Sequence, residues 1–217
     1  MQIAHRRRLM IAVASSGVML VMLAVIGVYG LFRGESQVGQ SNSTTPRTPV
    51  PFQSVERVQP PRPVLVTTDG DLFARSVARA LFTWDTRADA GVSEWEQRLV
   101  DVADPTEAAA VASDVRNYLP TTEMWEQLGT FGTRQWIRLK SVAVPRTWST
   151  ALRQAAPGQI PPDALAFTVT GTSHREGIWG TEPLHTERQV SFTVFVVCPS
   201  ETPCSLLRLS QLDRPLD

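Results

Sequence analysis

The sequence predicts an α+β protein: an N-terminal transmembrane helix, then an outer domain in which three to four helices pack on a curved antiparallel sheet of about four strands. Three observations lead to this prediction. A long uncharged segment lies near the N-terminus. Beyond it, apolar residues first recur at helical spacing, and in the second half of the chain they alternate with polar residues.

The N-terminal segment has the pattern of a single membrane span. Residues 9–32 contain no charged side chain. As a helix they would extend about 36 Å, enough to cross a hydrocarbon core of about 30 Å. Arg6, Arg7 and Arg8 precede the span, so residues 1–8 are expected to stay in the cytoplasm and the remainder to lie outside the cytoplasmic membrane. The alternative is a cleaved signal peptide, whose apolar region is usually shorter.

A spacer and a folded domain are expected beyond the span. Residues 33–68 are rich in proline, serine and threonine, a composition that buries too little apolar surface to fold and favours extended conformations. Residues 69–217 form the outer α+β domain. Without the four arginines that flank the span, 17 basic residues remain against 21 acidic ones, a net charge of −4. This charge belongs to the whole part of the chain beyond the span, which is unsuited to nucleic acid because nucleic acid requires clustered positive charge.

Four helices are predicted in the first half of the domain, each with apolar residues at helical spacing. Capping boxes, or a proline at the first helical position, indicate where helices begin. The four segments are residues 72–84, a helix opened by a capping box from Ser93 to Glu96, a helix opened by Asp104 and Pro105 and ended by Pro120, and residues 122–128.

Four strands are predicted in the second half, where apolar and polar residues alternate. This alternation is typical of an antiparallel sheet with one face on helices and the other face partly open. The predicted strands lie around residues 137–140, 165–170, 189–198 and 206–212.

Cys198 and Cys204 flank a turn-forming stretch between the last two predicted strands. If the two cysteines face each other across this hairpin, Phe195 pairs with Leu207, and a disulfide can form. The outer side of the membrane is where disulfides persist. The alternatives are two free thiols or half of a metal site. Zinc would need two further ligands, and His5, His174 and His185 lack zinc-like spacing, so no metal or other cofactor is expected.

The sequence shows no convincing catalytic constellation, and we expect the protein not to be an enzyme. The acid–base candidates are His174 with Glu176, His185 with Glu187, and Tyr118 or Asp114. The two histidine–glutamate pairs lie in polar stretches beside a turn predicted over residues 177–183, on a strand face that we expect to be solvated. Tyr118 is interpreted as a core aromatic whose hydroxyl finds a partner.

The tryptophans divide into two groups. Trp84, Trp95 and Trp125 share predicted helix faces with other apolar residues and are expected in the core. Trp179 lies in the predicted turn, where no neighbour in the sequence buries it. An exposed aromatic residue of this kind often anchors an interface, so we predict that Trp179 contacts a partner. The alternative is ordinary loop packing.

The order of helices followed by a curved sheet resembles the cone-shaped fold of nuclear transport factor two, ketosteroid isomerase and the cystatins. The basic stub, single span, spacer and outer domain together resemble the membrane-anchored assembly factors of type IV secretion and conjugation systems in Gram-positive bacteria and actinobacteria. This resemblance implies a non-enzymatic scaffold that contacts itself and other membrane or channel components, without direct nucleic-acid or small-molecule partners. The alternatives are an envelope protein associated with a lipid-import or other transporter, and a small-molecule-binding or enzymatic cone domain.

Overall fold

The computed structural model describes Val58 and residues 60–217, which belong to one structural unit. Within these residues, no helix is both long enough and apolar enough to span a membrane. The predicted stub with Arg6, Arg7 and Arg8, the predicted span over residues 9–32 and most of the predicted spacer lie outside the described residues.

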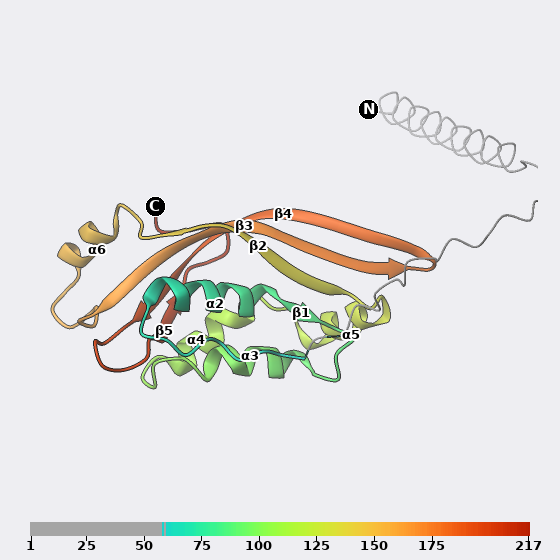
Figure 1. The fold of residues 1–217 in the computed structure, drawn as a ribbon, viewed down its shortest axis with the longest axis horizontal. Helices are drawn as coiled ribbons and strands as arrows, with labels where there is room; N and C mark the ends of the chain where they lie inside the picture. The colour runs from blue at the N-terminus through green and yellow to red at the C-terminus, as the bar shows by residue number, and fades with distance from the viewer. Residues whose placement is uncertain (1–57, 59) are drawn as a thin grey trace, which may run out of the picture. The chain divides into compact units, whose positions relative to one another are not determined.

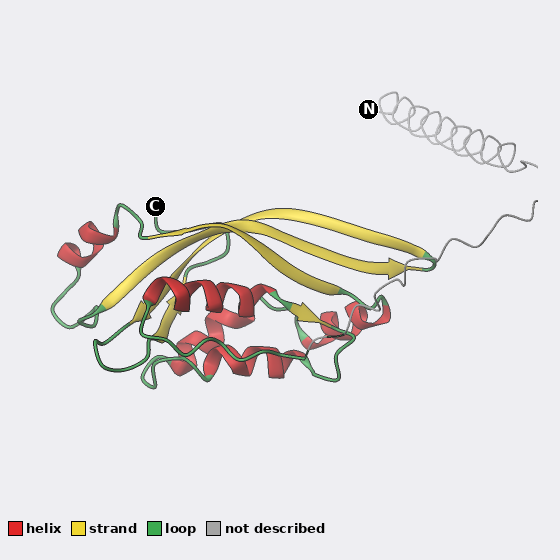
Figure 2. Cartoon of the chain, viewed as in Figure 1, coloured by secondary structure: helices red, strands yellow, loops and turns green. Residues whose placement is uncertain are grey.

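The described chain has the predicted α+β class, with five helices and a curled antiparallel sheet of five strands in the order β1-β2-β3-β4-β5. Helices α2, α3 and α4 lie under the concave side of the sheet, and α6 lies at the opposite end of the long strands from their exposed tip (Figures 1 and 2). The elements in chain order are α2 (Gly70–Phe82), β1 (Trp84–Asp85), α3 (Val92–Val100), α4 (Ala108–Arg116), α5 (Thr122–Thr130), β2 (Arg134–Ala143), α6 (Trp148–Gln154), β3 (Ala164–Trp179), β4 (Glu182–Val197) and β5 (Ser205–Leu209).

Side chains cap the starts of α2 and α3. The Asp69 carboxylate accepts a hydrogen bond from the Leu72 backbone at 3.0 Å and so begins α2. The predicted capping box from Ser93 to Glu96 is wrong by two residues, because Glu94 accepts from the Gly91 backbone at 3.1 Å and the helix begins at Val92. The α3 helix then buries Trp95 and Leu99, four residues apart, on one side.

Of the other two predicted helices, one starts three residues later than predicted and the other starts where predicted. The Asp104 carboxylate accepts from the Thr106 backbone at 2.9 Å in an irregular turn, and regular helix α4 begins only at Ala108. Thr121 caps α5 through the Met124 backbone at 3.2 Å. The predicted helix over residues 122–128 therefore corresponds to α5, which extends to Thr130.

The sheet is covered on both faces near the start of β3. The main core lies on the concave side, where Val169, Phe192 and Val194 pack against the helices. A second cluster lies on the other face, where Trp148 of α6 packs with Ala166. Alternate residues of a strand point to opposite faces, so both core clusters draw on the same strands.

The hairpin of β3 and β4 is much longer than predicted. The two strands pair along their whole length, from Ala164 opposite Val197 to Trp179 opposite Glu182. Gly180, with φ of 62°, occupies the turn, a left-handed conformation that favours glycine. The wide turn predicted over residues 177–183 is therefore wrong. Every residue of β4 from 182 to 189 is exposed, so this half of the hairpin projects beyond the packed helices (Figure 1).

The predicted disulfide between Cys198 and Cys204 is formed, with the Cα atoms 4.1 Å apart. Beside it, Val196 pairs with Leu206 as the prediction requires, but a bulge then shifts the register. Phe195 pairs with Arg208, so the predicted pairing of Phe195 with Leu207 is wrong.

The bulge in β5 has a clear packing reason. In a regular strand, residues 206 and 208 would share a face, and the Arg208 side chain would enter the core with Leu206. The extra residue moves Leu209 onto that face instead, and both leucines are buried in the main core. Arg208 stays exposed and pairs with Asp114 of α4 at 2.8 Å.

Candidate functional site

A cavity of about 610 Å³ opens where the end of α2, the α3 helix and the start of β2 meet residues 60–63. Its walls combine positive charge with aromatic surface. The charged and aromatic lining residues are Arg62, Arg79, Arg98, Arg134, Asp85, Trp84, Trp95 and Trp136.

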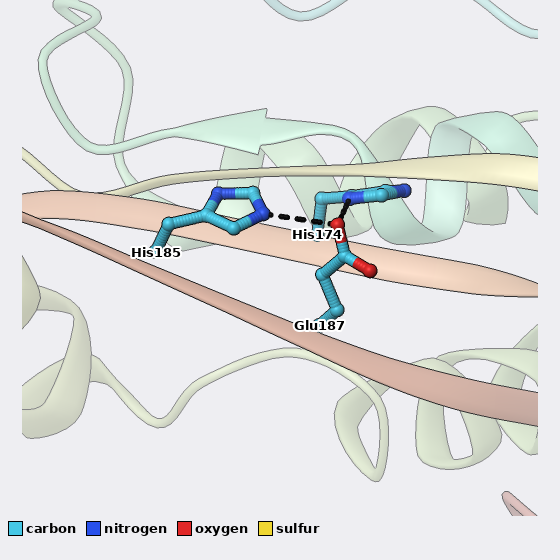
Figure 3. A group of neighbouring side chains, drawn as sticks. All are labelled: His174, His185 and Glu187. Atoms are coloured by element: carbon cyan, nitrogen blue, oxygen red, sulfur yellow. Dashed lines mark hydrogen bonds and ion pairs between the residues drawn. The ribbon is translucent and has the colours of Figure 1, made fainter.

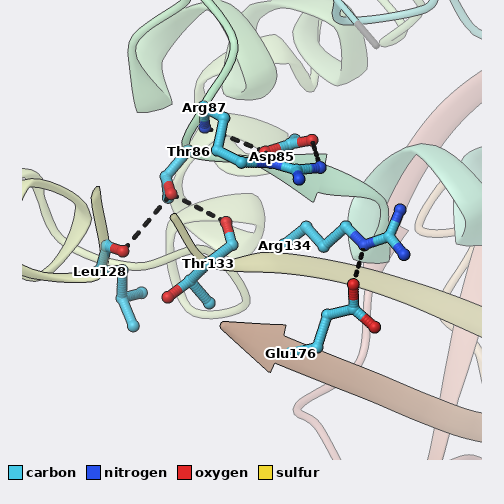
Figure 4. A network of polar contacts seen from close by, with 7 residues as sticks. All are labelled: Asp85, Thr86, Arg87, Leu128, Thr133, Arg134 and Glu176. Atoms are coloured by element: carbon cyan, nitrogen blue, oxygen red, sulfur yellow. Dashed lines mark hydrogen bonds and ion pairs between the residues drawn. The ribbon is translucent and has the colours of Figure 1, made fainter. Parts of the chain in front are cut away.

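The acidic residue of the wall does not balance these arginines. The Asp85 carboxylate accepts hydrogen bonds from the Arg87 side chain at 2.8 and 2.6 Å (Figure 4). Burial alone would raise the pKa of Asp85, but the hydrogen bonds and charge of Arg87, together with the charge of Arg134, outweigh burial and hold the pKa below its ordinary value. Arg134 pairs with Glu176 of the neighbouring strand. Among the described lining residues, four arginines therefore stand against a single acid, Asp85.

The cavity walls also hold most of the unsatisfied buried donors of the described residues. Among the described residues, five buried side-chain nitrogens have no hydrogen-bond partner. Four of the five belong to residues that line the cavity: Nε1 of Trp84, Nε1 of Trp95, and Nε and Nη2 of Arg98. All four are donors. Burial lowers the pKa of Arg98 to about 10, while its Nη1 donates to the Arg62 carbonyl at 2.6 Å. Buried donors without acceptors are costly, but these nitrogens have almost no accessible surface, so an occupant with acceptor oxygens would reach them only after the side chains turn toward it.

The tryptophans predicted for the core are buried. Trp84 and Trp95 are almost completely inaccessible, and Trp125 of α5 packs against both, with ring centroids 5.6 and 6.3 Å away. The prediction of core burial is confirmed. Trp84, however, lies in the short strand β1 and not in the preceding helix, which ends at Phe82.

The tip of the long hairpin is apolar and exposed. Ile178, Trp179 and Leu184 form this hairpin tip, with exposed fractions of 59%, 62% and 53%. The expected exposure of Trp179 is confirmed. The ring is not isolated, though, because it stacks on Phe131 with centroids 4.8 Å apart. A partner contact by Trp179 stays a prediction.

Three side chains meet on the convex face of the same hairpin, and we call them the His–Glu cluster: His174, His185 and Glu187 (Figure 3). Glu187 Oε1 lies 3.1 Å from His174 Nδ1 and 3.2 Å from His185 Nε2. The hydrogen bond from His185 and the charges of both imidazoles lower the pKa of Glu187. The carboxylate is therefore held ionised between the two rings.

Two expectations for these residues need correction. The expected solvated face is wrong for His174, which is only 6% exposed because its ring stacks on Trp136 with centroids 5.3 Å apart. His174 also pairs with Glu187 on the next strand and not with Glu176, which binds Arg134. His185 and Glu187 do share an exposed strand face as expected, and their side chains are 3.2 Å apart.

The sequence held a signal for this cluster that ligand spacing does not reveal. If the hairpin closes tightly on Gly180 and Thr181, residue 174 must face residue 187 across the strands, as observed. The wide turn predicted from Gly177 and Pro183 hid this pairing. Along the chain the two histidines are far apart, so ligand spacing alone could not bring them together.

Tyr118 and Asp114 have structural roles. The Tyr118 hydroxyl donates to the Ser210 carbonyl, and the ring packs against Phe82 and Phe192, which confirms the prediction of a core aromatic with a satisfied hydroxyl. Asp114 accepts from the Arg208 side chain and from the Leu209 backbone. Both residues thereby attach β5 and the C-terminal segment to α4.

Compared with known proteins, the chain matches no family model, no curated protein and no solved structure. Function is therefore inferred from the chain's own residues.

Proposed function

We propose that the protein is a non-enzymatic scaffold of a bacterial conjugation or type IV secretion apparatus. In this proposal residues 9–32 anchor it in the cytoplasmic membrane, residues 33–68 act as a spacer, and the α+β domain docks other components outside. The finer likeness to the nuclear transport factor two fold belongs to the same proposal.

The sequence pattern and the disulfide support the outer location. Arginines precede a 24-residue uncharged segment, the arrangement expected of a span with its N-terminus inside. The bond between Cys198 and Cys204 is of a kind that persists in oxidising compartments. The two features are independent of each other and agree.

The observation that carries the docking role is the projecting half of the β3–β4 hairpin. Residues 182–189 of β4 are exposed, and the hairpin tip adds three large apolar side chains. The β5 strand pairs only with residues 194–197, so the outer edge of residues 182–189 has no neighbouring strand among the described residues. An open edge with an apolar tip can accept a strand from a partner. Protein partners with an extended segment fit this surface.

Substitution of the hairpin tip tests the proposal. The full-length chain is expressed in its native host and recovered from detergent-solubilised membranes together with its partners. Trp179→Ala is expected to remove at least one partner while leaving the melting temperature of the domain nearly unchanged. Leu152→Ala on α6, which is 44% exposed, is the matched control and should retain all partners.

The identity of the recovered proteins decides between related functions. Channel or ATPase components of a conjugation system support the proposal, and lipid-import components would replace it with the envelope-transporter alternative. Equal partner recovery by wild type and Trp179→Ala would contradict docking through the tip. A protease that leaves residues 69–217 intact on spheroplasts would contradict the outer location.

A second candidate function, binding of a small organic anion, is favoured by the cavity between α2, α3 and β2. Unpartnered buried donors from Trp84, Trp95 and Arg98 would be satisfied by a carboxylate or phosphate. Tryptophan fluorescence of the full chain, titrated with benzoate and with inorganic phosphate, tests this. Saturable quenching that is lost in Arg98→Gln but kept in the exposed-site control Arg153→Gln supports an anion site, and a flat titration excludes these two probes as ligands.

A further inference from the structure

We propose that the His–Glu cluster on the projecting hairpin binds a divalent transition-metal ion, with zinc as the reference ion. The ligands are Nδ1 of His174, Nε2 of His185 and Oε1 of Glu187. None of the three ligands lines the arginine-lined cavity, although Trp136 borders both places, and the inference does not depend on the scaffold proposal.

The distances suit a single small cation. The three donor atoms lie within 4.8 Å of one another, and the carboxylate oxygen is 3.1 and 3.2 Å from the two nitrogens. Three ligands placed tetrahedrally at zinc-bond length are about 3.4 Å apart. Small side-chain rotations therefore bring all three atoms to bonding distance of one ion.

Backbone pairing holds the ligands in place. His174 of β3 lies directly opposite Glu187 of β4, and His185 is two residues before Glu187 on the same strand. Residues that alternate by two share a face, and directly paired residues are close neighbours. All three side chains therefore project from one face of a rigid hairpin (Figure 3). A site on paired strands is better ordered than one on a loop.

The surroundings of His174 favour ligation through Nδ1. The ring is buried against Trp136 and His185, with centroids 5.3 and 5.8 Å from it. Its Nε2 atom is buried without a hydrogen-bond partner, so the Nδ1 contact with Glu187 is the ring's polar contact in the described structure. The stacked tryptophan keeps the imidazole edge directed at the cluster, as Figure 3 shows for Nδ1 and Glu187.

Charge and ligand type select the class of metal. The cluster offers one carboxylate and two imidazoles, and the nearby Glu176 is already paired with Arg134. Imidazole ligands suit zinc, copper, nickel and cobalt, whereas calcium and magnesium prefer oxygen ligands. His185 and Glu187 have side chains about half exposed, at 47% and 57%. Three protein ligands with an open side leave a coordination position for water or for a donor from another molecule.

Metal titration of the untagged full-length chain in detergent micelles tests this proposal. After treatment with a chelator, Co²⁺ is followed by visible absorption and Zn²⁺ by calorimetry. We expect one equivalent of each metal to bind, and zinc to raise the melting temperature, because a ligand of the native state stabilises it. Ca²⁺ and Mg²⁺ at the same concentrations should not compete.

Variants locate the site. His185→Ala and Glu187→Gln change exposed side chains and should fold normally, and each should weaken Co²⁺ binding at least about tenfold, since even residues behind the ligands contribute that much. Glu182→Gln, a carboxylate on the same strand but the opposite face, is the control and should bind like wild type. Absence of a bound equivalent in wild type, unchanged binding in His185→Ala, or equal binding of Ca²⁺ would each overturn the proposal.

Discussion

The two halves of the β3–β4 hairpin share strands, register and hydrogen bonding, yet they have opposite environments. Near Ala164 and Val197 the strands are buried on both faces, by the main helices on one side and by α6 on the other. Beyond Gly171 the same strands are largely exposed on β4 and carry polar side chains. The packed half therefore specifies the fold, which leaves the projecting half free to carry recognition or binding.

The largest effect that the comparison predicts is at the packed half. Phe192→Ala removes a fully buried ring that contacts Phe82 and Tyr118. We expect a loss of about 3–5 kcal/mol in the free energy of unfolding, because a cavity is left in the core. Urea denaturation followed by circular dichroism measures it. A loss below about 1 kcal/mol would mean that this half does not hold the fold together as described.

The next effect lies at the junction between the halves, at Gly171. A Cβ atom at this position would lie 2.7 Å from the Arg138 carbonyl of β2, so Gly171→Ala must push the strands apart. We expect the free energy of unfolding to fall by about 1–3 kcal/mol. Gly129→Ala on α5, where an added Cβ meets no atom within 4 Å, is the matched control and should not destabilise. If both substitutions behave alike, the close approach of β2 and β3 is not a constraint.

Removal of the disulfide should have an effect of similar size on the packed half. The bond between Cys198 and Cys204 closes a short loop beside β5. For a loop of this length, the entropy model gives a loss of about 2 kcal/mol for the double replacement Cys198→Ser and Cys204→Ser. The change in melting temperature with and without reductant checks this in the wild-type chain. Reductant should leave the double variant unaffected.

The smallest effect is expected at the projecting half. Leu184→Ala alters a side chain that is 53% exposed at the hairpin tip. We expect the free energy of unfolding to change by less than about 0.5 kcal/mol, as for most exposed positions. Partner recovery from membranes should nevertheless fall if the tip is a docking surface. A stability loss as large as that of Phe192→Ala would remove the distinction between the two halves.

The same division explains what could be predicted from the sequence. Helices α2 to α5 and the packed parts of β2 to β5 have one face buried against the core. Their hydrophobic periodicity therefore predicts these elements from the sequence. The polar half of the hairpin buries neither face of β4, and without alternation its strands were interpreted as a wide turn. The two-residue strand β1 exists through pairing with β2, and α6 through packing of Trp148, which are tertiary effects.

The candidate sites follow a similar rule. Cys198 and Cys204 were predictable as a pair because a local hairpin brings them together. The His–Glu cluster needed the correct turn, since a shift of one residue in register places side chains on the wrong face. The arginine-lined cavity joins residues 60–63 to α2, α3 and β2, and no local pattern reports such distant neighbours. The sequence therefore predicts contacts within a local hairpin, but it does not predict contacts between segments that are distant along the chain.

The stack of Trp179 on Phe131 links the far end of the hairpin to the helical layer. Phe131 immediately follows α5, and its carbonyl also accepts a hydrogen bond from the Ile178 backbone at 2.8 Å. Through Trp125, the same helix packs against the indoles of Trp84 and Trp95. A molecule that binds the end of the hairpin would therefore displace α5, which contacts two tryptophans of the cavity wall through Trp125. The fluorescence of Trp84 and Trp95 would report that displacement.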